Sequence, residues 1–183
     1  MGDVPRILHC HSSFDLGGKE ARAVRLINDF GAAVHHVVLS AVPDALGARD
    51  AIDAGIEVEF PGDAPLLAGQ PGHARYETLG RYMQGFDLVL TYNWGAMDAV
   101  MTRRVHGRRY GLPPLIHHED GFNADEARGQ KMKRVWFRRL ALGAAHALVV
   151  PSRQLEAIAR ESWKQPPAHV RRIANGIAVA RYA

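Results

Sequence analysis

The chain has 183 residues, of which 47% are hydrophobic and 23% are charged. This length and composition fit one globular domain with a full core and exclude a second domain of ordinary size. The net charge of +4 favours anionic ligands only modestly. The single cysteine, Cys10, excludes an internal disulfide, fits a reducing compartment, and is expected to be a small core residue.

No window approaches the ~20 consecutive apolar residues that span a bilayer. The first residues, Met1 to Pro5, lack the charged-then-apolar pattern of a signal peptide. We therefore expect a cytoplasmic protein.

The first structural unit predicted from the sequence runs from Arg6 to Phe30. An apolar stretch at 6–11 predicts a strand, and a polar turn at 12–18 follows it. Apolar residues then recur at three- and four-residue spacing, which predicts a helix with one buried face. The residues expected on this face are Ala23, Leu26, Ile27 and Phe30.

The turn contains two adjacent glycines, Gly17 and Gly18, and two interpretations of them stay open. Glycines here let the backbone approach a ligand, and the helix N-terminus behind them favours an anion. Alternatively, the turn only requires a positive φ angle. Dinucleotide binding of the usual kind is disfavoured, because five residues separate His11 from Gly17 and the third glycine of that motif is missing.

Six further apolar stretches predict strands, with helical patterns between them. The strands are expected at 35–39, 57–60, 86–91, 115–118, 147–150 and 170–173. The helices are expected at 47–54, 76–84, after Gly95 with Met97, Val100, Met101 and Val105 on one face, at 131–144, and after Ser152 as N-cap. This alternation predicts an α/β fold, with a doubly wound, mostly parallel sheet of about seven strands and helices on both faces.

In such a sheet, ligands bind outside the carboxyl ends of the strands. The side chains that follow four of the predicted strands are polar or aromatic, and they suit a polyhydroxylated, partly charged ligand. They are His11, Ser12 and Ser13; Tyr92, Asn93 and Trp94; His118, Glu119 and Asp120; and Ser152 and Arg153.

Ten histidines raise the question of a metal site, but the sequence has no H-E-x-x-H motif and no helical pair of histidines four residues apart. We therefore expect no metal. A serine hydrolase is disfavoured by the absence of a G-x-S-x-G motif. Most of the histidines are expected to be core or surface residues. His118, at the exit of a strand beside two carboxylates, is the one retained as a functional candidate.

The helix predicted at 131–144 is basic and aromatic. It carries Lys131, Lys133, Arg134, Trp136 and Arg138. One interpretation is a solvated helix with an aromatic core face, and the other is a surface that contacts anionic lipid or an anionic acceptor. Four arginines at 103, 104, 108 and 109 form a second cluster with the same two interpretations. No nucleic-acid recognition motif accompanies these charges, so we expect no nucleic-acid partner.

Taken together, these residues resemble the N-terminal domain of retaining family-4 ("group 1") glycosyltransferases of the GT-B fold, which use nucleotide-sugar donors. The resemblance covers nearly the whole chain. It rests on the G-G-x-E turn at 17–20, the Asn93 loop, the segment 117–121, and the sequences at 149–155 and 173–177. It implies a Rossmann-like domain that is one half of a GT-B fold, with a role in polysaccharide or cell-envelope glycan synthesis.

Two departures from the family pattern affect the domain assignment. Ala178 stands where the family usually has an aspartate, and the chain ends at Ala183. We expect residues 1–183 to be a single acceptor-side domain. The resemblance implies a C-terminal nucleotide-sugar domain that we expect to be absent from these residues, so this chain is expected to be inactive alone.

The resemblance also implies roles for individual residues. Gly17 and Gly18 would lie in the cleft near the donor phosphates, and His118 would contact the transferred sugar. Asn93, Glu119, Asp120 and Ser152 would line the acceptor side. The family's same-face mechanism needs neither a protein nucleophile nor a metal. No cofactor is therefore expected, and the nucleotide sugar would be a substrate. A lipid-linked acceptor would approach the basic, aromatic helix, with peripheral contact to the membrane.

Two other functions stay open. One is a stand-alone Rossmann-like module that binds a phosphorylated or sugar ligand without catalysis. The other is an α/β enzyme of different chemistry.

Overall fold

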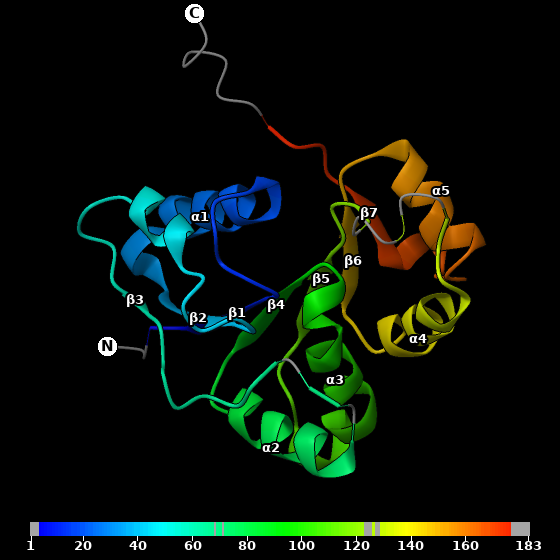
Figure 1. Cartoon of the computed structure of the whole chain (residues 1–183), viewed down its shortest axis with the longest axis horizontal. Coiled ribbons are helices and arrows are strands. Elements are labelled where there is room, and N and C mark those ends of the chain that lie inside the picture. The colour runs from blue at the N-terminus through cyan, green and yellow to red at the C-terminus, as the bar shows by residue number, and fades with distance from the viewer. Residues whose placement is uncertain (1–3, 68, 71, 123–125, 127–128, 177–183) are drawn as a thin grey trace, which may run out of the picture.

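The computed structural model describes residues 4–67, 69–70, 72–122, 126 and 129–176, which form one parallel sheet flanked by helices (Figure 1). Seven strands lie in the spatial order β3-β2-β1-β4-β5-β6-β7, and every neighbouring pair is parallel. In chain order they are β1 (Arg6–His11), β2 (His35–Ser40), β3 (Val58–Glu59), β4 (Leu88–Tyr92), β5 (Leu115–His118), β6 (Ala147–Val150) and β7 (Val170–Arg172). The predicted Rossmann-like α/β fold is confirmed.

The longer helices are α1 (Gly18–Phe30), α2 (His73–Met83), α3 (Met97–Tyr110), α4 (Met132–Leu142) and α5 (Arg153–Glu161). Short 3₁₀ turns occur at η1 (Gly31–Ala33), η2 (Gly47–Ala51), η3 (Trp94–Ala96) and η5 (Pro167–His169). Helix α1 and η2 cover one face of the sheet, and α2, α3, α4 and α5 contribute to the core on the other. Both faces therefore bury apolar side chains, as a parallel sheet requires.

The strand order reverses between β1 and β4. The chain runs outward from β1 to β3 and then returns to place β4 on the other side of β1. The loop after β1 consequently packs beside β2, where Phe14 N–H donates to Ala45 O and Ala48 N–H donates to Phe14 O, both over 2.8 Å. The loop after β4 leads toward β5. Diverging loops at such a reversal are where open α/β sheets bind ligands.

The two loops still come into close contact where η3 meets Ser12. A Cβ added to Gly95, in η3, would lie 2.1 Å from Ser12 Cβ and 2.8 Å from Ser12 Cα. No side chain larger than hydrogen fits between these backbones, so a glycine is required here by close approach.

Several boundaries and faces differ from the sequence predictions. The helix expected at 47–54 is a 3₁₀ turn at Gly47–Ala51, and the third strand has only two residues at the sheet edge. Phe30 is 44% exposed because it ends α1, where the chain turns through Gly31. Val105 is 49% exposed because α2, α4 and the sheet pack on other sides of α3. The expected burial of Phe30 is therefore wrong, and Val105 does not share the buried face of Met97, Val100 and Met101.

Gly95→Ala is expected to destabilise the fold by about 1–3 kcal/mol, the usual cost of overpacking. Urea unfolding of the variant measures this. Gly143→Ala is the matched control, because Gly143 has a helical φ of −61° and a Cβ there meets no atom within 4 Å. Equal stability of the two variants would contradict the close contact between the loops.

Candidate functional site

A groove of about 410 Å³ lies at the carboxyl edge of the sheet, between the first turns of α1 and the segment that follows β7. Gly18, Arg22 and Arg25 line it from α1, and Asn175 lines it from the opposite side. Its floor includes His118, at the end of β5, and Val149 from β6. The groove thus lies on the α1 face of the sheet, beside the reversal of strand order.

His118 is almost fully buried, and its Nδ1 has no hydrogen-bond partner within the described residues. Burial, followed by the nearby guanidinium of Arg22 and the His117 ring, lowers its pKa from 6.5 to about 3. The imidazole is therefore neutral at physiological pH. A neutral ring carries one N–H donor and one acceptor nitrogen, which suits hydrogen bonds to hydroxyl groups.

A row of buried rings backs His118. The parallel register places Tyr92 beside it, with ring centroids 4.8 Å apart, and Tyr92 stacks on His11 at 4.2 Å. Tyr92 Oη also lies 3.2 Å from His9 Nδ1. Burial is the largest cause that lowers the pKa of His9 to about 3 and that of His11 well below its ordinary value. The row is thus electrically neutral.

His9 and His11 share the α1 face, whereas Cys10 is buried on the opposite face, as strand alternation predicts. Burial raises the pKa of the Cys10 thiol, so this residue is an unreactive part of the core.

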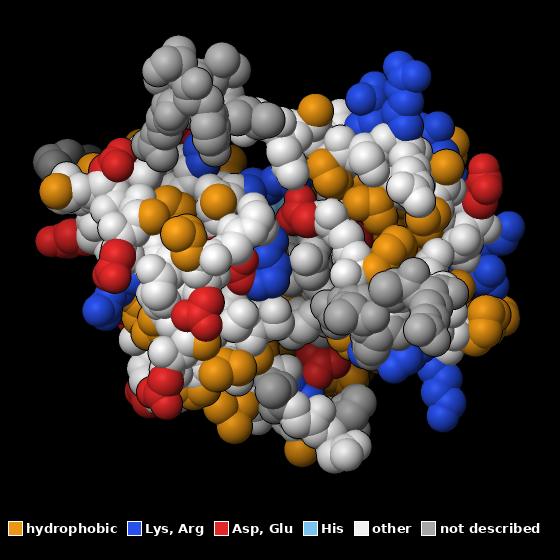
Figure 2. Space-filling model, turned by 45° about the horizontal axis from the view of Figure 1, so that its top comes forward, with side chains coloured by type: hydrophobic (Ala, Val, Ile, Leu, Met, Phe, Trp, Pro, Cys, Tyr) orange, Lys and Arg blue, Asp and Glu red, His pale blue; other side chains and the backbone are white. Residues whose placement is uncertain are grey.

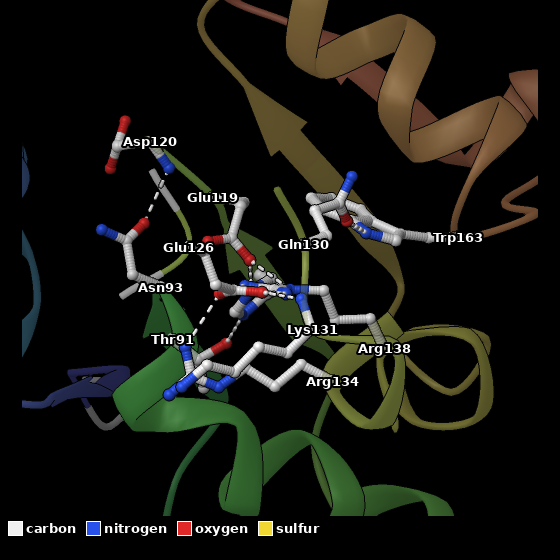
Figure 3. Close-up of polar contacts among 11 residues, drawn as sticks. Thr91, Asn93, Glu119, Asp120, Glu126, Gln130, Lys131, Arg134, Arg138 and Trp163 are labelled. Atoms are coloured by element: carbon white, nitrogen blue, oxygen red, sulfur yellow. Dashed lines mark hydrogen bonds and ion pairs between the residues drawn. The ribbon is translucent and has the colours of Figure 1, made fainter. Parts of the chain in front are cut away.

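Asn93 joins the loops after β4 and β5. It has a φ of 55° and a ψ of −171°, a strained conformation outside the left-handed helical region that few residues other than glycine adopt. Its N–H donates to His118 O over 2.8 Å, and its Oδ1 accepts a 2.7 Å hydrogen bond from Asp120 N–H (Figure 3). Asn93 therefore shapes the exit of β5 through its backbone and side chain.

Asp120 forms an ion pair with Arg22 of α1, with Oδ1 and Nη2 2.9 Å apart. Burial raises the pKa of Asp120, against the opposing effect of Arg22. Arg22 also donates to Asn175 Oδ1, and its Nη1 is buried without a hydrogen-bond partner among the described residues. Arg22 thus connects α1 to the loop after β5 and to the segment after β7. The sequence analysis did not select Arg22 or Arg25, although both follow the glycine turn on one helix.

The two glycines of the turn do not require unusual backbone angles. Gly17 is the extended N-cap of α1, with φ of −148°, and Gly18 begins the helix. Neither has a positive φ, so that interpretation of the turn is wrong. A Cβ at Gly18 would meet no atom within 4 Å, and one at Gly17 would only need to displace the Glu20 carboxylate at 2.9 Å. The open space beside Gly18 belongs to the groove.

Glu119 points to the other side of the sheet from His118. Its side chain is fully buried, and its Oε2 accepts from Arg138 Nε over 3.2 Å and lies 3.5 Å from His117 Nε2 (Figure 3). The expectation that Glu119 lines the acceptor side is therefore not met, because alternation along the chain directs it away from the groove.

Arg138 is also fully buried. Its Nη1 lies 3.3 Å from Glu126 Oε1, and its guanidinium lies 4.9 and 5.0 Å from the ring centroids of Trp94 and Trp163. Burial alone would raise the pKa of Glu126, but hydrogen bonds from Arg138 and Arg134 bring it below its ordinary value. The prediction that Arg138 belongs to an exposed basic surface is wrong, since two carboxylates hold it in the interior.

The other members of that predicted surface differ in exposure. Lys131, Lys133 and Trp136 are exposed, whereas Arg134 is partly buried with Nη1 2.9 Å from Glu126 Oε2. Ser152 is the N-cap of α5, as predicted, since its Oγ accepts from Leu155 N–H over 3.1 Å. Ser152 is not among the described residues that line the groove.

Comparison with protein families gives a match to the description "Glycosyl transferase 4-like domain" over residues 17–176. This match spans the glycine turn, the six strands from β2 to β7 and the segment with Asn175, and it begins after β1. The chain belongs to this family. The resemblance to the N-terminal domain of family-4 glycosyltransferases is thereby confirmed. A comparison with curated proteins finds no match.

Solved structures share the fold of this glycosyltransferase domain. HepE from Anabaena, determined in complex with UDP, is 16% identical with a TM-score of 0.66, and the match covers 97% of this chain and 46% of HepE. The chain thus spans about half the length of that protein. A sucrose-phosphate synthase structure from Thermosynechococcus elongatus is 17% identical with a TM-score of 0.51, and the match covers 97% of this chain and 92% of that one.

In the part of the domain that the structure describes, no helix has the length and apolar character needed to cross a membrane. The same residues contain no group of three or more His, Cys, Asp or Glu side chains arranged to hold a metal ion.

Arg138→Ala is expected to destabilise the glycosyltransferase domain by about 3–5 kcal/mol, because Glu119 and Glu126 would remain buried without their partner. Lys133→Ala, on the exposed side of the same helix, is the control and should change stability by about 0.5 kcal/mol or less. Chemical unfolding of both variants measures the difference. An equal loss of unfolding free energy in the two variants would contradict the role of the buried Arg138 guanidinium in holding the segment after β5 against α4.

Stability of the domain is expected to fall as pH drops below about 6.5, the ordinary histidine pKa. The folded pKa values of His9 and His118 are depressed to about 3, so the unfolded chain binds more protons than the folded chain between these limits. Each residue then contributes a slope of about 1.4 kcal/mol per pH unit. Urea unfolding between pH 7.5 and pH 5 tests this. His118→Gln should remove the contribution of His118 to the slope of stability against pH. A flat profile would contradict the neutral histidine row.

Proposed function

We propose that this domain is the acceptor-side half of a retaining glycosyltransferase, which moves a sugar from a nucleotide-sugar donor to a glycan or lipid-linked acceptor. Its setting would be polysaccharide or cell-envelope glycan synthesis in the cytoplasm. One observation carries the proposal. A neutral imidazole, His118, lies on the floor of a groove whose rim includes Gly18 and the first turns of α1. The complexes of HepE with UDP and with UDP-glucose agree with this choice of donor class.

The charge state of His118 fits sugar transfer. As the bond between the sugar and phosphate breaks, positive charge develops on the sugar ring, and a protonated imidazole would oppose it. A neutral imidazole does not, and it can hydrogen-bond to a sugar hydroxyl. In the proposed reaction, the acceptor oxygen attacks the face from which the phosphate leaves. The leaving phosphate takes the acceptor's proton, so the protein supplies no nucleophile.

The start of α1 would serve the phosphate. Its N-terminal N–H groups and helix dipole favour an anion, and Gly18 leaves the backbone accessible from the groove. Asn93 and Asp120 would act by holding the end of β5 in place, and His118 is the last residue of that strand. We propose that the nucleotide binds mainly to a second domain, without a metal or cofactor. The domain formed by residues 1–183 would then be inactive alone.

The proposal is tested in a protein that carries this domain together with its nucleotide-sugar domain. His118→Gln and Gly18→Val are each expected to lower kcat by about 100-fold or more, as when a transition-state contact is lost. Gly18→Val should stay folded, because a Cβ at Gly18 meets no atom within 4 Å. Gly143→Ala is the control with unchanged turnover.

The outcomes separate the two candidate functions. Unchanged turnover in both variants would overturn the assignment of the groove as the transfer site. Sugar-phosphate binding to the groove without transfer to any acceptor would instead favour a stand-alone binding module.

A further inference from the structure

Positive charge is concentrated at the start of α1. Residues 1–98 carry 13 acidic and 7 basic side chains, and three of the basic ones, Lys19, Arg22 and Arg25, lie within the first eight residues of that helix. Figure 2 shows most visible Asp and Glu side chains on the left, where α1 and the edge strands lie, and Lys and Arg side chains near the middle of the view. The groove thus has a cationic side in an otherwise acidic half of the chain.

Two guanidinium groups line the groove without a carboxylate beside them in its walls. Arg22 and Arg25 are lining residues, and none of the described residues that line the groove is an Asp or Glu. Arg22 uses its Nη2 for Asp120 and Asn175, but its Nη1 is buried and has no hydrogen-bond partner within the described part of the chain. A buried donor without a partner is costly, so a group from outside the chain is expected to supply the missing acceptor.

Arg25 is available to the same ligand. Its ion-pair partner is Asp29 on the same helix, at 3.8 Å, and the two side chains are 59% and 67% exposed. Such a pair contributes little to stability, so the fold does not require it. Arg25 also reaches across the groove, since a Cβ added to Gly176 would lie 3.2 Å from Arg25 Nη1. The Arg25 guanidinium therefore lies between the two walls.

The surroundings strengthen the attraction for an anion. Leu26, Val149 and Ile173 also line the groove, and apolar walls lower the local dielectric constant around the two guanidinium groups. His118 offers a neutral ring whose Nδ1 has no partner among the described residues, and it lies close enough to Arg22 for that charge to help lower its pKa. A hydroxyl group suits His118, and an oxyanion suits the arginines.

The donor phosphates would occupy a different place. In the proposed function they lie at the N-terminus of α1, and a rise of 1.5 Å per residue puts Arg22 and Arg25 about 6 Å and about 10 Å from Gly18 along the helix. A nucleotide sugar with a neutral sugar has its phosphates between two bulky groups and presents no terminal oxyanion. The anion for Arg25 is therefore expected from the other substrate.

We propose that the acceptor is an anionic sugar whose terminal carboxylate or phosphate binds Arg25 and the free Nη1 of Arg22, while a hydroxyl of the same sugar lies at His118. A neutral acceptor would leave Arg22 Nη1 unpaired, so the site discriminates against it. That this ligand is the acceptor rests on the proposed function, whereas the oxyanion site itself rests on the groove alone.

The first experiment is an NMR titration of the 183-residue chain with glucuronic acid, glucose 6-phosphate and glucose at equal concentrations. Glucuronic acid or glucose 6-phosphate is expected to shift the amide signals of α1 and of residues 173–176. Glucose should bind about 10-fold or more weakly, because it forms no charge-assisted hydrogen bond with the arginines. The acid that binds identifies the oxyanion as a carboxylate or a phosphate.

Matched variants test the arginine. Arg25→Gln is expected to weaken binding of the anionic sugar about 10-fold or more, and Arg25→Lys, which keeps the charge, should weaken it less. Arg160→Gln is the control and should bind like the unchanged chain. Arg160 is also an exposed helical arginine with an acidic partner four residues away, Glu156, and its helix α5 lies on the opposite face of the sheet.

Kinetics connect the site to transfer. In a protein that carries this domain together with its nucleotide-sugar domain, Arg25→Gln should raise KM for the anionic acceptor about 10-fold. It should leave kcat and KM for the nucleotide sugar unchanged, because Arg25 would contact only the acceptor.

Two kinds of failure are distinguishable. Absence of transfer to any acceptor would overturn the proposed function, and the NMR titration would still decide whether the oxyanion site exists. Three results would overturn the anionic acceptor and leave the transfer proposal standing. They are no binding of either acid, equal binding of glucose and the acids, and equal effects of Arg25→Gln and Arg160→Gln.

Discussion

The reversal of strand order between β1 and β4 is the constraint on which the rest of the structure depends. It sends the loop after β1 toward β2 and the loop after β4 toward β5, and leaves the N-terminus of α1 beside the end of β5. The two loops touch at Gly95 and Ser12, in the close contact described above. Arg22 of α1 then reaches both Asp120 and Asn175, which closes the groove over His118.

Successive side chains at the end of β5 point to opposite faces of the sheet. His118 faces α1 and the groove, while His117 and Glu119 face the opposite side, where Glu119 contacts Arg138. The buried cluster of Arg138, Glu119 and Glu126 connects α4 to the segment that carries His118 and Asp120 (Figure 3). A fully buried ion cluster adds little net stability compared with apolar packing, but breaking it is costly. Its value here is that it fixes one backbone path at the edge of the groove.

The sheet, its seven strands, the cap at Ser152 and the place of His118 at a strand exit could be predicted from the sequence, because these follow from local periodicity and turn chemistry. The burial of Arg138 could not be predicted, since its partners Glu119 and Glu126 lie in the segment after β5, at separations that no local pattern encodes. Glu119 was misplaced because the alternation of the strand continues one residue past its end. Arg22 was missed because a single arginine on a helix gives no signal until the strand order places Asp120 beside it.

The central claim is that this domain supplies the acceptor side and His118, while the nucleotide binds mainly elsewhere. Thermal denaturation of the 183-residue chain with UDP-, GDP- and ADP-sugars tests it most directly. A ligand that binds the folded state raises apparent stability by RT ln(1 + [L]/Kd), so even a weak site shows at about millimolar ligand. The account predicts no shift of the transition with any nucleotide sugar. A clear shift with one of them would show that this domain has a nucleotide site of its own. That result would contradict the proposal that the nucleotide binds mainly to another domain.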